Sequence, residues 1–109
     1  MATTYKVLAQ SAPSATTDTP VYTVPSATMA VISTIVVANR SASDAQYRIA
    51  VRPDGATLAN QHYLAYDVTV GASDSTTITL GITMDAADVL NIYASSADLS
   101  FNVFGSEIA

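Results

Sequence analysis

The chain contains no cysteine and no tryptophan, and it has one histidine and four glycines. Without cysteine it has neither disulfides nor a thiolate metal site. Any histidine-dependent catalysis must use His62, whose neighbours Asn60, Gln61 and Tyr63 favour a surface or loop-packing role. No glycine-rich phosphate loop and no Gly-x-Ser-x-Gly motif is present. These absences predict a protein that is not an enzyme and binds no cofactor.

Charge is also scarce and unevenly placed. Only 12% of the residues are charged, against roughly 25% in an ordinary soluble domain. The net charge of −5 argues against a nucleic-acid partner, which needs a basic patch. Residues 1–52 carry a net +2 and residues 53–109 a net −7. Either strands from the two halves interleave and the arginines pair internally, or complementary patches join copies head to tail.

No segment of the sequence suggests a membrane partner. Residues 1–6 lack a basic stretch followed by an apolar one, so we expect no signal peptide. The longest apolar run, residues 29–38, is about half the ~20 residues that a spanning helix needs. This run therefore predicts a buried strand.

The clearest structural pattern lies in residues 46–55. Tyr47, Ile49 and Val51 alternate with more polar residues, which is the two-residue period of a half-buried strand. The following Pro53-Asp54-Gly55 predicts a type I turn. The 26 serines and threonines of the chain, interspersed with valine and isoleucine, favour strands over helices throughout.

Other segments extend this pattern. Residues 20–25 are bracketed by prolines, which predicts an edge strand. Residues 28–39 predict either a central strand covered on both faces or a strand that crosses from one sheet to the other. Residues 76–82 alternate regularly, with Leu80 among the inward positions. Residues 11–17 predict a flexible loop or arm.

Short strands separated by turns every 8–12 residues, without an amphipathic helix, predict an all-β fold. We expect one domain spanning residues 1–109, an antiparallel β-sandwich of about eight strands with jelly-roll or immunoglobulin-like topology. The predicted core consists of Val31, Ile35, Val37, Tyr47, Ile49, Val51, Ile78, Leu80, Val89, Ile92, Leu99, Phe101 and Val103.

Carboxylates offer one candidate metal site. Asp85 and Asp88, with Asp98 ten residues further on, would hold a calcium ion if they gathered at one end of the sandwich. Their spacing matches no established calcium loop, and aspartates in turns normally bond to their own backbone. The sequence leaves a structural calcium ion at Asp85 and Asp88 open, and we assign no metal ligand.

Tyrosines are the leading candidates for partner contacts, because one end of the side chain is apolar and the other forms hydrogen bonds. Tyr63 and Tyr66 lie three residues apart in a predicted strand, so they should point to opposite faces. Tyr5, together with the 11–17 segment, is expected to contact a neighbouring protein.

Arg40, Arg48 and Arg52 are the candidates for charged contacts with a partner. Free-standing sandwiches usually protect their edge strands with lysine or inward charges, whereas this chain has a single lysine, Lys6. We therefore expect neighbouring subunits to cover the edges, which predicts a homo-oligomer.

Several segments resemble small structural proteins of tailed-bacteriophage virions. They consist of strand and turn residues and cover most of the chain from Val21 onward. They are Val21–Pro25, Ser33–Ser41, Tyr47–Pro53, Tyr63–Asp67, Leu80–Thr83 and Phe101–Gly105. The resemblance implies a non-enzymatic, multi-copy virion component.

This resemblance leads to an expected function. The leading interpretation is a capsid decoration or cement protein that binds the major capsid protein across neighbouring subunits and stabilises the shell. A neck, tail or fibre protein of the same particle is the alternative. A carbohydrate-binding module, from a different functional class, would need an exposed aromatic platform, for which only tyrosines are available.

Overall fold

The computed structural model describes residues 2–109, and within them nine strands form two antiparallel sheets packed face to face. The all-β, single-domain sandwich predicted from the sequence is confirmed. The strands are β1 (Thr3–Ser11), β2 (Thr19–Thr23), β3 (Met29–Asn39), β4 (Ala45–Arg52), β5 (Tyr63–Val70), β6 (Ser75–Ile78), β7 (Ile82–Met84), β8 (Val89–Ala94) and β9 (Leu99–Ile108). Two single 3₁₀ turns, η1 (Pro53–Gly55) and η2 (Asn60–His62), lie between β4 and β5.

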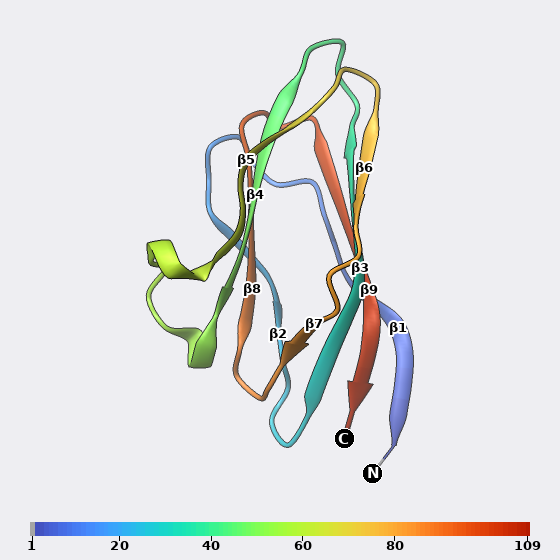
Figure 1. Ribbon diagram of the computed structural model, residues 1–109, viewed down its shortest axis with the longest axis vertical. Helices are drawn as coiled ribbons and strands as arrows, with labels where there is room; N and C mark the ends of the chain where they lie inside the picture. Colours follow the sequence, from blue (N-terminus) through green and yellow to red (C-terminus); the bar gives the residue numbers. More distant parts are fainter. Residues whose placement is uncertain (1) are drawn as a thin grey trace.

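The chain folds as one long hairpin, in which early strands pair with late ones: β1 with β9, β2 with β8, β3 with β6 and β7, and β4 with β5. Successive pairs belong alternately to the five-stranded and the four-stranded sheet. The five-stranded sheet has the order β1-β9-β3-β6, with β7 also paired to β3, and the four-stranded sheet has the order β2-β8-β4-β5. Figure 1 shows the two sheets side by side, with the chain ends close together. If β6 and β7 are counted as one interrupted strand, this is the eight-stranded order of a jelly roll.

Most of the predicted core lies between the sheets. Nine of the thirteen predicted residues are buried, namely Ile35, Val37, Tyr47, Ile49, Val89, Ile92, Leu99, Phe101 and Val103. Val31, Val51 and Ile78 are only partly buried. The predicted central position of β3 is confirmed, since it pairs with β9 on one side and with β6 and β7 on the other. The predicted edge position of β2 is also confirmed.

The prediction of one continuous strand over residues 76–82 is wrong. Along β3, Ile35 pairs with Ile78 and Ile32 with Ile82, so the partner segment has one residue more than β3. The backbone turns at Gly81, where φ is +67°, a value that glycine adopts without strain. Leu80, predicted to be buried, therefore lies in the break between β6 and β7 and is 61% exposed.

Two connections also differ from simple expectation. The turn at Pro53-Asp54-Gly55 is present, but Asp54 and Gly55 have φ of +54° and +67°, whereas a type I turn keeps both central residues at negative φ. The segment after β1 crosses from one sheet to the other and packs against the domain. In it Pro13 is buried, and the Thr16 N–H donates to Ala94 O at 2.7 Å.

Within residues 2–109, none of the helical segments is long and apolar enough to cross a bilayer.

Gly105 marks the closest approach between two strands. Beside it, β3 has a bulge at Ser33, where the register with β9 shifts between Ile32 and Thr34. A Cβ atom at position 105 would collide with the carbonyl oxygen of Val31. It would also lie only 3.0 Å from the Cα atom of Ile32. Because the neighbouring atoms are backbone, they cannot move aside without disturbing the ladder.

We therefore expect Gly105→Ala to lower the free energy of unfolding by about 2 kcal/mol or more through overpacking. Gly71→Ala is the matched control, because a Cβ there lies at an ordinary 3.8 Å from Asp74, and it should change stability by less than about 0.5 kcal/mol. Urea denaturation followed by circular dichroism measures both. Equal stability of the two variants would contradict the close approach of β3 to β9.

Candidate interaction surfaces

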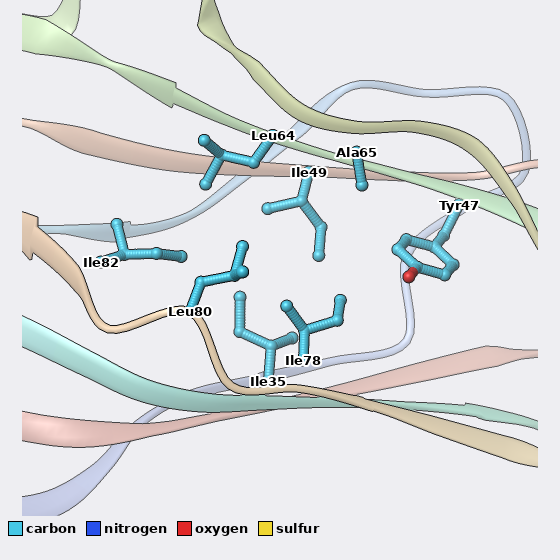
Figure 2. Close-up of a pocket in the computed structure, with 8 residues that line it drawn as sticks. All are labelled: Ile35, Tyr47, Ile49, Leu64, Ala65, Ile78, Leu80 and Ile82. Atoms are coloured by element: carbon cyan, nitrogen blue, oxygen red, sulfur yellow. The ribbon is translucent and has the colours of Figure 1, made fainter.

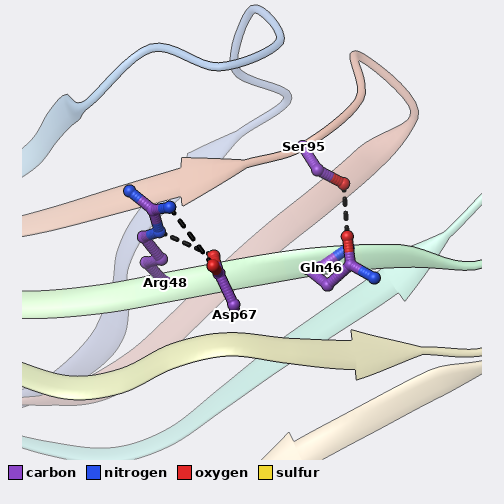
Figure 3. Close-up of polar contacts among 4 residues, drawn as sticks. All are labelled: Gln46, Arg48, Asp67 and Ser95. Atoms are coloured by element: carbon purple, nitrogen blue, oxygen red, sulfur yellow. Dashed lines mark hydrogen bonds and ion pairs between the residues drawn. The ribbon is translucent and has the colours of Figure 1, made fainter.

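The outer face of the four-stranded sheet carries a cluster centred on Arg48. Its Nε donates to Asp67 Oδ1 at 2.7 Å and its Nη2 donates to Asp67 Oδ2 at 3.3 Å, as Figure 3 shows. The guanidinium carbon lies 4.1 Å from the ring centroids of both Tyr66 and Tyr93. Tyr63 meets Tyr66 edge to face, with the ring centroids 4.9 Å apart. We call these five residues the Arg48 cluster.

The prediction that Tyr63 and Tyr66 point to opposite faces is wrong. Along β4, Tyr47 pairs with Val68, Ile49 with Ala65 and Ala50 with Tyr63, so β5 contains two extra residues. Each bulge reverses which side the following residues face. The bulge between Ala65 and Tyr63 therefore brings both rings to the same surface, and Asp67, in the other bulge, takes a φ of +52°.

The groups of the Arg48 cluster are engaged with one another. The bidentate hydrogen bonds to Asp67, followed by the charge of that carboxylate and of the tyrosines, raise the pKa of Arg48 above its ordinary value. One ring face each of Tyr66 and Tyr93 is covered by the guanidinium. The cluster attaches the edge strand β5 to β4 and β8, and this arrangement argues against an open aromatic platform for a sugar.

Beside the cluster, a further hydrogen bond supports the same sheet. The Gln46 N–H donates to Ser95 Oγ at 2.9 Å (Figure 3), and the Ser95 N–H donates to Gln46 O at 2.9 Å. Together they connect β4 to the turn between β8 and β9.

The other two predicted arginines contact neutral groups. Arg40 donates from Nε to Ser100 Oγ at 2.8 Å and from Nη2 to Ala97 O at 3.0 Å. Arg52 donates from Nε to Asn91 Oδ1 at 3.0 Å. The two ion pairs, Arg48–Asp67 and Lys6–Glu107, each join the basic and acidic halves of the sequence, so internal pairing accounts for two of the four basic residues.

Residues considered for chemistry are also engaged locally. His62 Nδ1 accepts a hydrogen bond from the Ala59 N–H at 3.0 Å. The Asp88 carboxylate accepts from the Asp54 N–H at 2.9 Å and from the Asp85 N–H at 2.8 Å. Asp98 lies beyond the other end of β8 from Asp85 and Asp88, so the three carboxylates do not gather as the calcium site considered above would require. Among residues 2–109, no three histidine, cysteine or acidic side chains lie close enough to hold a metal ion.

The outer face of the five-stranded sheet has a different character. Strand alternation places Val7, Phe104 and Thr34 in one outward row across β1, β9 and β3, and Tyr5, Ser106 and Val31 in the next. Further rows contain Gln10, Asn102 and Val36, and Thr3, Ile108 and Met29. Thr77 and Thr83 extend the rows onto β6 and β7. None of these outward residues is charged, and we call this surface the uncharged face.

Tyr5 protrudes from the uncharged face beside a shallow hollow. Its side chain is 83% exposed, and Val7 and Met29 are also exposed. The hollow, with a volume of about 500 Å³, is lined by residues of β1, β3 and β9 that include Val7, Val31 and Phe104. Lys6, which pairs with Glu107, also borders it. Exposed apolar residues gathered in this way are typical of protein contact surfaces. Of the predicted partner-binding residues, only Tyr5 lies here.

A second apolar feature opens at one edge of the sandwich. A groove of about 220 Å³ lies between β5 and the β6–β7 segment, and Figure 2 shows its side chains pointing toward one another from the two sheets. Leu64 and Leu80 form its exposed rim, and Ile35 and Ile49 lie at its floor. Sequence reasoning missed this groove, because it results from the break at residues 79–81.

The opposite edge of the sandwich is closed by a polar network. Glu107 on β9 accepts a hydrogen bond from the Tyr22 hydroxyl on β2 at 2.5 Å and pairs with Lys6 Nζ on β1 at 2.7 Å. Hydrogen bonds from Lys6 and then Tyr22 lower the pKa of Glu107 below its ordinary value near 4.5. Burial, followed by the hydrogen bond to Glu107, raises the pKa of Tyr22. The network joins the two sheets.

Comparison with known proteins gives no relative for this chain: no family model, no curated protein and no solved structure matches it.

We expect Arg48→Met to lower the free energy of unfolding by about 1 kcal/mol, because it removes two exposed cation–π contacts and one partly exposed ion pair. Arg48→Lys should restore only part of this loss, since an ammonium group does not stack on two rings. Arg40→Met is the control. Urea denaturation followed by tyrosine fluorescence measures the three variants, and full stability of Arg48→Met would contradict an energetic role for the cluster.

The lowered pKa of Glu107 predicts a pH-dependent contribution. Its ionised form stabilises the native state above the unfolded-state pKa, and this contribution is lost as pH falls through the lower native-state pKa. Glu107→Gln should therefore cost about 1 kcal/mol at pH 7, and the difference from wild type should shrink as pH falls below about 4.5. Urea midpoints at pH 7, 5 and 3 test this, with Asp98→Asn as the control. A difference that stays constant with pH would exclude this ionisation as its cause.

Proposed function

We propose that this chain is a non-enzymatic structural component of a phage virion, in the first place a capsid decoration or cement protein. Its partner would be the major capsid protein, bound across neighbouring subunits. The observation that carries the proposal is the uncharged face, which spans the five-stranded sheet and exposes Tyr5, Val7 and Met29. A surface of this kind stays out of water when another protein covers it.

Three further observations support the proposal. The segments quoted from the sequence resemble small virion structural proteins, and jelly rolls recur in viral capsid proteins. The second point is an analogy at the level of fold, which many functions share. In addition, His62, Asp88 and Arg48 are each engaged in local hydrogen bonds, as expected for side chains with structural roles.

A neck, tail or fibre position in the same particle is the alternative. The uncharged face suits a protein contact on the capsid shell as well as in the neck, tail or fibre. An experiment must therefore locate the chain in the particle.

Quantitative mass spectrometry of purified virions tests the proposal by giving the copy number. A decoration protein should approach the copy number of the major capsid protein, whereas a neck, tail or fibre protein should be far rarer. Purified chain should also co-sediment with undecorated capsids, with a sample lacking capsids as the control for self-aggregation. Absence from purified virions, together with failure to co-sediment, would refute the proposal.

A further inference from the structure

We infer that the uncharged face binds a second copy of this chain, forming a two-fold dimer with the five-stranded sheets face to face. This inference rests on the proposed function in taking the face as a protein contact. It assigns that face to a second copy, so the major capsid protein would contact other surfaces of the dimer.

Charge is the first argument for a second copy. The chain carries a net charge of −5, so most of its surfaces would repel the same surface on another copy. The outward rows that contain Phe104, Ser106 and Asn102 carry no charge, so a two-fold contact there opposes no like charges.

The polar groups of the face give the second argument. They are hydroxyls and amides, for example those of Thr34, Asn102 and Ser106. Such groups both donate and accept hydrogen bonds. A surface made of them can pair with an identical surface, which one lined by lysine or aspartate alone cannot do.

Shape and size agree with this arrangement. Tyr5 projects next to the hollow lined by Val7, Val31 and Phe104. In a two-fold contact the same patch of each copy forms the interface. Because Tyr5 lies beside the hollow, the Tyr5 side chain of each copy can enter the hollow of the other. Four strand positions side by side, each about ten residues long, give the face an area on the order of 600 Å². Specific protein interfaces bury roughly 600–1,000 Å² on each partner, so the face is large enough.

Sedimentation velocity across a range of protein concentrations tests the inference. Wild type should sediment at twice the 11.3 kDa of one chain. The double variant Tyr5→Glu/Val7→Glu places four carboxylates in the interface, so its dissociation constant should rise on the order of 100-fold. Leu80→Glu is the matched control, because Leu80 is similarly exposed but lies at the groove, and this variant should dimerise like wild type.

A charge-reversal pair keeps the test independent of stability. Tyr5→Lys/Val7→Lys should also be monomeric alone, and mixing it with Tyr5→Glu/Val7→Glu should restore a dimer, because opposite charges then face each other. Circular dichroism checks that each variant is folded.

Three outcomes would overturn the inference. The first is a wild-type protein that stays monomeric up to about 100 μM. The second is a dimer that the Leu80→Glu substitution dissociates and the Tyr5/Val7 substitutions do not. The third is a mixture of the Lys and Glu double variants that stays monomeric. A monomeric chain found at high copy number in virions would refute the dimer and leave the proposed function standing. A dimeric chain that is absent from virions would support the dimer and refute the proposed function.

Discussion

Each strand of a two-sheet sandwich hides the side chains of only one face, because successive side chains alternate across the sheet. Here the inner positions of both sheets supply one core, which includes Phe101, Ile35 and Ile49. The outer positions therefore decide what the molecule contacts. On the four-stranded sheet they include the Arg48 cluster, whose groups bind one another. On the five-stranded sheet the outer positions named above carry no charge. Gln10 donates to Asn102 there at 2.7 Å, but the apolar side chains of Tyr5, Val7 and Met29 stay exposed.

Alternation in the sequence predicted the fold wherever the strand ladders are regular. Tyr47 and Ile49 are buried as their period indicated, and the charge-free run of β3 lies in the middle of its sheet. The prediction failed at bulges, because one extra residue moves every following side chain to the other face. The pair Tyr63 and Tyr66 is the example. At Leu80 the strand is interrupted instead, while Ile78, Ile82 and Met84 keep facing the core, and only Gly81 gave any local sign of this break.

The interaction surfaces were predictable only in part. Arg48, Tyr63 and Tyr66 were selected individually, but their assembly depends on Tyr93, which is distant in sequence and is placed by the pairing of β8 with β4. The lack of charge in residues 29–39 and 99–106 was visible in the sequence. Which of those residues face outward was not, because it depends on sheet order and on the bulge at Ser33.

The two edges of the sandwich indicate which apolar surface suits a protein contact. Next to the uncharged face, Lys6, Glu107 and Tyr22 join the sheets, and the backbones of Ala2 and Ala109 bond to each other. These bonds hold β1 and β9 in place before any partner arrives, so binding there requires little ordering of the chain. The groove at the other edge is held by side-chain packing around the interrupted β6–β7 segment. A partner in the groove would meet residues 79–81, which form no ladder pair with β3, whereas a partner on the uncharged face meets strands whose hydrogen bonds to one another are already made.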